Sequence, residues 1–186
     1  MTYDDDSRIA RAEDLLTGLG AEDMTHPGGT LLAHLRRVRS RLADWHARPA
    51  LQLAGLCHAL YGTDGFPEAL LPPARRTEAA EVIGREAEAA VYFYASCDRK
   101  ATYPTLTGPD SPFHDRFTGA VLTPAPPALA DFAELTAANE IDLAAHDPAF
   151  RERWGPQLSA LFNRFGPLLS EAAREDCRVV LGGAQA

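Results

Sequence analysis

Lysine is almost absent from this 186-residue chain: Lys100 is the only one, and the other basic residues are arginines and histidines. Acidic residues outnumber lysine and arginine, and the formal net charge is −8 at pH 7. Nucleic-acid binding depends largely on positive surface charge, so this composition argues against a nucleic-acid partner. The basic run from Arg36 to Arg41 is best explained as the solvated face of a helix.

Cysteines and long apolar segments are also scarce. Cys57, Cys97 and Cys177 are far apart and odd in number, so we expect neither a disulfide framework nor a zinc ribbon. We predict that Cys57 and Cys97 are buried structural thiols. No stretch approaches the roughly 20 apolar residues that a membrane span requires. The first eight residues have no basic region followed by an apolar one, which predicts a cytoplasmic protein without a signal peptide or membrane partner.

Apolar residues recur at helical spacing through most of the chain. This pattern predicts an all-α fold, a compact single-domain helical bundle over residues 1–186. Ser7 is the predicted N-cap of the first helix. Further helices are expected at about 30–47, from Pro49 onward, at 77–82, 86–98 and 129–145, and twice within 148–181. The segments 25–29, 61–73 and 101–127 are rich in glycine and proline and are predicted loops.

Three histidines occur in or beside the two helices expected at the centre. His34 interrupts the apolar stripe of the helix at 30–47, and His58 interrupts the most apolar helix of the chain. His26 lies in the loop before them. A buried imidazole without a hydrogen-bond partner costs roughly 1–3 kcal/mol. One partnered histidine in a core is ordinary, whereas three in neighbouring segments predict a shared site.

The segment Leu53-Ala54-Gly55-Leu56-Cys57-His58-Ala59 and the preceding His34 resemble the HD superfamily of metallohydrolases. Its members place a histidine on one helix, a His-Asp doublet after an apolar run, and an aspartate on a distal helix. His34 and His58 are 24 residues apart. His26-Pro27 and the segment 81–88 are similar in outline to the (p)ppGpp-hydrolase branch. The resemblance covers roughly residues 25–145 and implies an HD-like helical core there, followed by C-terminal helices at 148–181.

Two features depart from the HD pattern. Ala59 replaces the aspartate of the doublet and cannot bind a metal, and the distal aspartate has no clear equivalent. Asn139 and Glu140 are the nearest candidates for the distal ligand. The resemblance implies a site in which iron, manganese or zinc is bound by three histidines and one carboxylate, and its ligands would be His26, His34, His58 and Glu140. No nucleotide-binding motif is present, so we expect no nucleotide cofactor.

Other polar residues could serve the same pocket. Tyr61 and Thr63 follow His58 directly, and arginine matches the geometry of carboxylates and phosphates, so the substrate could be anionic. The conventional explanations are a helix-end ion pair for Asp98 and Arg99 and a surface position for Arg76. We predict catalytic roles for His58, His34, Tyr61 and Asp98, and substrate-binding roles for Thr63, Arg76, Arg99 and Tyr103.

Two functional interpretations follow. The first is a small-molecule enzyme on an HD-like scaffold: a metal-dependent hydrolase or oxygenase, as the resemblance implies, or a lyase, isomerase or hydrolase that uses histidine acid–base chemistry without metal. The alternative is a non-catalytic binding or regulatory module that kept the fold and lost the chemistry. A homodimer could form through Trp154, Phe162 and Phe165 near the C-terminal end.

Overall fold

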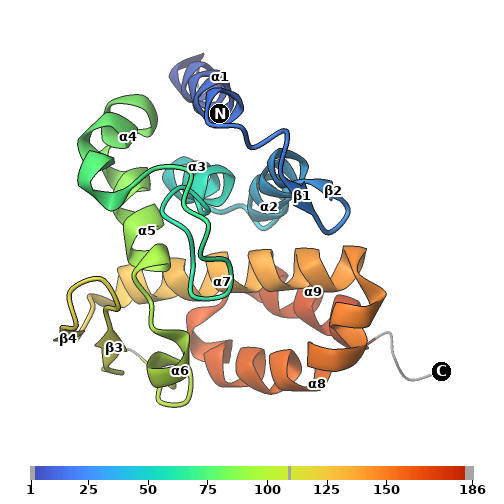
Figure 1. Cartoon of the computed structure of the whole chain (residues 1–186). Helices are drawn as coiled ribbons and strands as arrows, with labels where there is room; N and C mark the ends of the chain where they lie inside the picture. The colour runs from blue at the N-terminus through green and yellow to red at the C-terminus, as the bar shows by residue number, and fades with distance from the viewer. Residues whose placement is uncertain (1–2, 109, 183–186) are drawn as a thin grey trace. The chain divides into compact units, whose positions relative to one another are not determined.

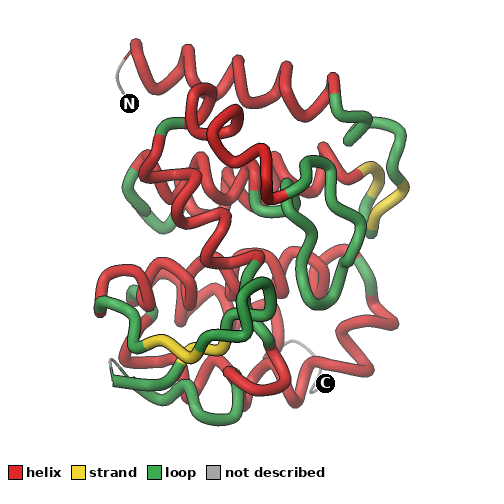
Figure 2. The backbone as a smooth tube through the Cα atoms, turned by 60° about the vertical axis from the view of Figure 1, so that its left-hand side comes forward, coloured by secondary structure: helices red, strands yellow, loops and turns green. Residues whose placement is uncertain are grey.

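The computed structural model describes residues 3–108 and 110–182, and side chains from residue 6 onward. The all-α prediction is confirmed: the described residues form nine α-helices and only two small two-stranded sheets (Figures 1 and 2). The chain divides into two compact units, an N-terminal unit of residues 1–96 and a C-terminal unit of residues 97–186. None of the described helices is long and apolar enough to cross a membrane.

The core of the N-terminal unit is built around α3. This helix packs against α2, α5 and α1, and it buries Leu51, Leu53, Ala54, Leu56 and Cys57, as expected for an apolar central helix. The prediction that Ser7 caps the first helix is wrong, because that helix begins at Tyr3 and includes Ser7. The five helices of the unit are α1 (Tyr3–Gly18), α2 (Leu31–Asp44), α3 (Pro49–Cys57), α4 (Arg76–Ile83) and α5 (Arg85–Ala95).

A short hairpin leads into α2, where the sequence predicted only a loop. Strands β1 (Thr25–His26) and β2 (Gly29–Thr30) pair antiparallel, with His26 opposite Gly29. Gly28 and Gly29 close the turn at φ angles of 77° and 132°, a region that glycine adopts without steric cost. The Thr30 hydroxyl then accepts a hydrogen bond from the Ala33 N–H and caps α2. The hairpin thereby places His26 beside the first turn of α2.

The C-terminal unit is organised around α7, which packs against both α8 and α9. Thirteen residues of α7 are buried, and they lie on all of its sides. The expected loop at 101–127 is partly structured, since it contains the end of α6 and a second hairpin. The elements of the unit are α6 (Arg99–Thr102), β3 (Phe113–His114), β4 (Val121–Leu122), α7 (Pro126–His146), α8 (Pro148–Phe165) and α9 (Glu171–Gly182).

All three cysteines are free and buried, as predicted for Cys57 and Cys97. Burial raises the pKa of Cys57 from 9.0 to about 12, so at pH 8 only roughly one native thiol in ten thousand is ionised. We expect 5,5′-dithiobis(2-nitrobenzoate) to label Cys57 at pH 8 only after unfolding. The pKa of Cys57 is higher in the folded state than in the unfolded state. The contribution of its neutral thiol to folding stability is therefore present below pH 9 and is lost between pH 9 and 12. Rapid labelling of Cys57 in the native protein, located by mass spectrometry, would contradict this expectation.

Candidate histidine site

The three predicted histidines come together within the N-terminal unit. His26 lies on β1, His34 on α2, and His58 directly follows the last residue of α3. The ring centroids of His26 and His34 are 4.2 Å apart, and those of His34 and His58 are 5.2 Å apart. His34 and His58 are buried, whereas His26 is half-buried. Two of the three imidazoles are therefore enclosed by the protein, and the third is partly exposed to solvent.

Two further aromatic rings extend the histidine row, and neither was predicted from the sequence. Phe66, in the loop after α3, meets His26 edge to face at a centroid distance of 5.9 Å. Tyr94, near the end of α5, meets His58 edge to face at 5.5 Å. Edge-to-face contact brings the positive edge of one ring to the electron-rich face of the other. Phe66, His26, His34, His58 and Tyr94 thus form a continuous row of rings.

The backbone of α3 selects the tautomer of the neutral His58 ring. Its Nδ1 lies 2.8 Å from the carbonyl oxygen of Gly55, and a carbonyl can only accept a hydrogen bond. In the neutral ring Nδ1 therefore carries the proton, and Nε2 keeps a basic lone pair. Gly55 also allows the close approach of α2 and α3, since a Cβ there would lie 2.5 Å from Cδ1 of Leu42. The same glycine thus orients His58 and lets α3 pack closely on the helix that carries His34.

The three histidines supply donor atoms that suit a metal, but the described residues around them do not include a metal-binding group. Imidazole suits iron and zinc, so the donor type is appropriate. The His26 and His34 rings are tilted by 31° from one another at a centroid distance of 4.2 Å. Within the described ranges, no group of three or more His, Cys, Asp or Glu residues is arranged to hold a metal ion. Glu140, the proposed fourth ligand, belongs to the C-terminal unit and is bonded there to Arg99.

Two other predicted site residues, Tyr61 and Arg76, are joined by Glu88. The Arg76 guanidinium donates hydrogen bonds to both carboxylate oxygens of Glu88, at 2.6 and 2.9 Å. The Tyr61 hydroxyl donates to Oε1 of the same carboxylate at 2.9 Å. The Arg76 guanidinium also lies 3.6 Å from the centroid of the Tyr92 ring. Burial and the Glu88 charge raise the pKa of Tyr61, so it stays protonated and is a hydrogen-bond donor. Arg76 is therefore engaged within the fold, and Glu88, which the sequence did not single out, is the centre of this network.

Thr63 stabilises the loop that carries Phe66. Its hydroxyl accepts from the Phe66 N–H at 3.0 Å, and its own N–H donates to the Phe66 carbonyl at 2.7 Å. Gly62 precedes it at a φ of 66°, and a Cβ there would lie 3.0 Å from the backbone oxygen of Pro67. Thr63 therefore has a structural role in this loop, and through Phe66 it supports the position of His26.

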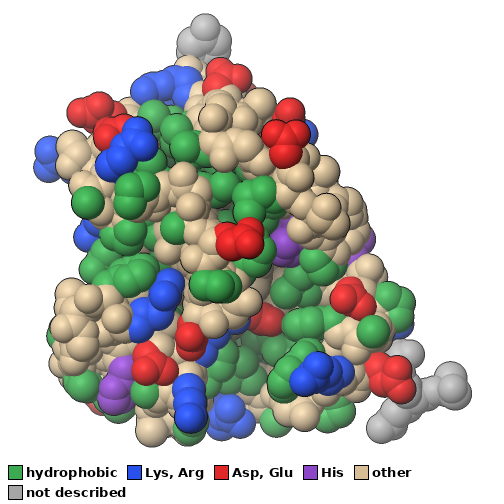
Figure 3. Space-filling view, viewed as in Figure 1, with side chains coloured by type: hydrophobic (Ala, Val, Ile, Leu, Met, Phe, Trp, Pro, Cys, Tyr) green, Lys and Arg blue, Asp and Glu red, His purple; other side chains and the backbone are tan. Residues whose placement is uncertain are grey.

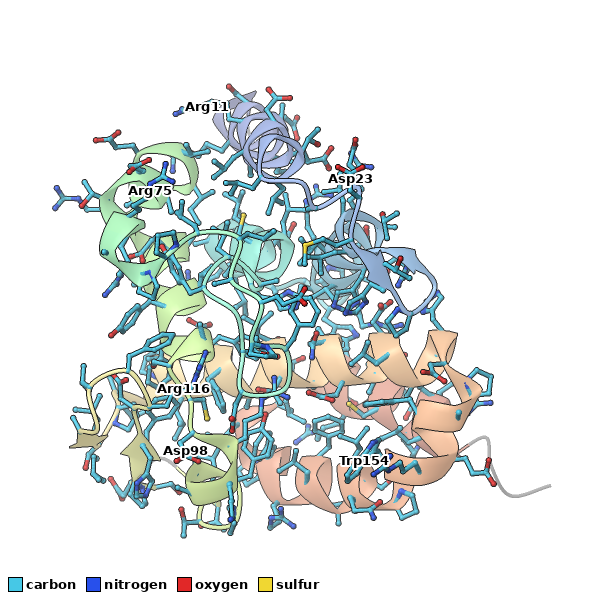
Figure 4. All side chains as sticks on the ribbon, in the orientation of Figure 1. Arg11, Asp23, Arg75, Asp98, Arg116 and Trp154 are labelled. Atoms are coloured by element: carbon cyan, nitrogen blue, oxygen red, sulfur yellow. The ribbon has the colours of Figure 1, made fainter. Side chains whose placement is uncertain are left out.

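The remaining predicted residues lie in the C-terminal unit. The sequence predicted that Asp98 ends the preceding helix. Instead, the Asp98 side chain (labelled in Figure 4) caps α6 by accepting a hydrogen bond from the Ala101 N–H at 2.9 Å. The predicted Asp98–Arg99 ion pair is replaced by an Arg99–Glu140 pair at 2.8 Å. The Asn139 amide donates to the same Glu140 oxygen at 3.2 Å. Tyr103 packs edge to face against Phe132 and Phe165. Each of these residues has an intramolecular partner in its own unit.

The visible surface is consistent with the charge composition. On the face shown in Figure 3, basic and acidic side chains are interspersed.

Comparison with known proteins identifies one similarity. Residues 15–99 match the model of a family described as "Domain of unknown function (DUF6817)". The match covers less than half of the chain, but it includes the whole histidine row and ends close to the boundary after Ser96. No curated protein matches the chain, and no solved structure matches it either.

Proposed function

We propose that this chain is a small-molecule enzyme whose N-terminal unit uses His58 as a general base. The observation that carries the proposal is the hydrogen bond from His58 Nδ1 to the Gly55 carbonyl, which leaves Nε2 as the proton acceptor. A ring that a backbone carbonyl holds in one tautomer, with Nε2 as its basic nitrogen, is the arrangement that proton transfer requires. The reaction class is hydrolysis, elimination or isomerisation that begins with the removal of a proton.

The surrounding residues have supporting roles in this proposal. His34 lies edge-on to His58 and shields it from solvent, and the half-buried His26 connects the row with the surface. The loop of residues 61–73 carries Phe66 over His26 and would have to open for a small substrate to enter. Tyr61 is the first residue of this loop and is protonated. It could donate a hydrogen bond to an anionic substrate group only after its hydrogen bond to Glu88 breaks.

The proposal predicts a specific loss of activity. Wild-type protein should convert at least one member of a panel of small phosphate esters, carboxylate esters and hydroxy acids. Replacing His58 with glutamine should lower kcat/KM by about a hundredfold or more, because general base catalysis contributes roughly 10²–10⁴. The matched control is His114→Gln in the C-terminal unit, which should stay within about twofold of wild type.

Circular dichroism must show that His58→Gln retains the fold. Full activity in a folded His58→Gln protein would refute His58 as the base. If the wild type has no activity on the panel, a non-catalytic binding module becomes the better interpretation.

A transition metal on the same three imidazoles is the second candidate, and the donor type favours it. His26 and His34 would be its closest pair of ligands, since their ring centroids are only 4.2 Å apart. Metal content should be measured on protein purified without chelators or a histidine tag, beside a His34→Ala, His58→Ala double variant. Near-stoichiometric iron, manganese or zinc that disappears in the double variant would replace the metal-free proposal.

A further inference from the structure

The N-terminal unit contains a second concave site, at the opposite end of α5 from Tyr94. This cavity has a volume of about 340 Å³. Arg8 of α1, Arg48 at the start of α3 and Arg85 of α5 line it together, and Leu53 and Ile83 contribute apolar walls. Arg85 and Tyr94 are separated by nine residues of helix, or roughly 14 Å at 1.5 Å per residue. The cavity is therefore distinct from the histidine row.

The charge of this cavity is opposite to that of the whole chain. Three guanidinium groups face one carboxylate, Glu86, which pairs with Arg48 at 2.5 Å. The residues that line the cavity thus include three arginines and one glutamate, whereas the chain as a whole has a net charge of −8. Arg85 is exposed, and it makes no hydrogen bond or ion pair within the described part of the chain. An arginine side chain without such a partner can bind an external anion.

Gly84 lets Arg8 lie close to the backbone at this site. A Cβ on Gly84 would be 3.0 Å from Nη1 of Arg8, and the φ of Gly84 is 86°. The start of α5 has no side-chain cap, so its first N–H groups face the same region without a side-chain acceptor. These N–H groups add a favourable dipole to the guanidinium charges.

We propose that this cavity binds the phosphate group of a small phosphorylated molecule. The arginine-rich lining complements the negative charge of a phosphate monoester, and guanidinium groups match the geometry of its oxygens. The cavity is larger than phosphate alone, which leaves room for an organic portion against Leu53 and Ile83. The site is independent of the histidine chemistry proposed above, so either proposal can fail while the other holds.

Calorimetric titration of the full chain with inorganic phosphate at pH 7.5 and constant ionic strength tests this site. Saturable binding is expected. Arg85→Gln should weaken it by about tenfold or more, because a charge-assisted hydrogen bond contributes roughly 1.5–3 kcal/mol. Since Arg85 has no hydrogen-bond or ion-pair partner among the described residues, this variant should keep its fold. The control is Arg178→Gln, which removes an arginine that pairs with Glu175 in α9 and should leave the affinity unchanged.

A second variant distinguishes binding from damage to the fold. Glu86→Gln removes the only carboxylate of the cavity and releases Arg48, so it should tighten phosphate binding several-fold. A structural disturbance would not increase affinity. The proposal is overturned if phosphate gives no more effect than chloride, or if Arg85→Gln and Arg178→Gln lose affinity equally.

Discussion

Replacing Glu88 with alanine is expected to lower the free energy of unfolding by about 3 kcal/mol. The Glu88 side chain is only 7% exposed and accepts hydrogen bonds from both Arg76 and Tyr61. Its removal would leave the buried Tyr61 hydroxyl without its acceptor and Arg76 without its counter-charge. The Arg76 side chain is 38% exposed, so water would compensate part of the loss. We therefore place the effect at the lower end of the range for broken buried ion pairs.

Urea unfolding followed by circular dichroism measures this change. Glu86→Ala is the matched control, because it lies on the same helix and its ion pair with Arg48 is exposed. We expect that variant to differ from wild type by no more than about 0.5 kcal/mol. Equal effects of the two substitutions would show that the Tyr61–Glu88–Arg76 network does not stabilise the fold.

The helical architecture followed from the sequence because apolar spacing is a local signal. The segment from Leu51 to Cys57 is apolar on all sides, and it is the central helix of its unit. Local capping was harder to predict. Ser7 is a good N-cap by residue type, but α1 begins upstream of it, and Asp98 caps α6 rather than ending α5. Several polar residues in one segment can cap a helix, and tertiary packing decides between them.

The convergence of His34 and His58 could be predicted, whereas the partners of the polar residues could not. Histidines in the apolar stripes of consecutive helices must face the same core, because α2 and α3 are joined by a short connection. Arg99 and Glu140, however, are 41 residues apart, and Arg76 and Glu88 belong to different helices. No local pattern distinguishes an arginine that meets a substrate from one that meets a buried carboxylate.

The boundary between the two units has no sequence signal that we can identify. The residues around Ser96 and Cys97 contain no linker rich in proline, glycine or serine, and the sequence favoured one domain over residues 1–186. The HD resemblance stays a prediction. Any chemistry that the resemblance implies now depends on the three histidines alone, because Ala59 cannot bind a metal and Glu140 is paired with Arg99.

Replacing Phe165 with alanine is expected to destabilise the C-terminal unit by about 4 kcal/mol, as is typical of a fully buried phenylalanine. Phe165 has no exposed surface, and its ring meets Tyr103 at 6.0 Å and Phe162 at 6.3 Å. The sequence grouped Phe162, Phe165 and Trp154 as a dimer-forming face. The two phenylalanines are buried in the core, so Trp154, which is 41% exposed, is the one member of the three that could contact another molecule.

The same helix therefore supplies both the test and its control. Trp154→Ala should change the free energy of unfolding of a monomer by less than about 1 kcal/mol, because the side chain is already partly in water. Thermal unfolding of the two variants and sedimentation velocity of each distinguish core from interface. A dimer in the wild type that dissociates in Trp154→Ala would support pairing through this face. Equal destabilisation by both substitutions would contradict the distinction, because an exposed ring loses far less packing than a buried one.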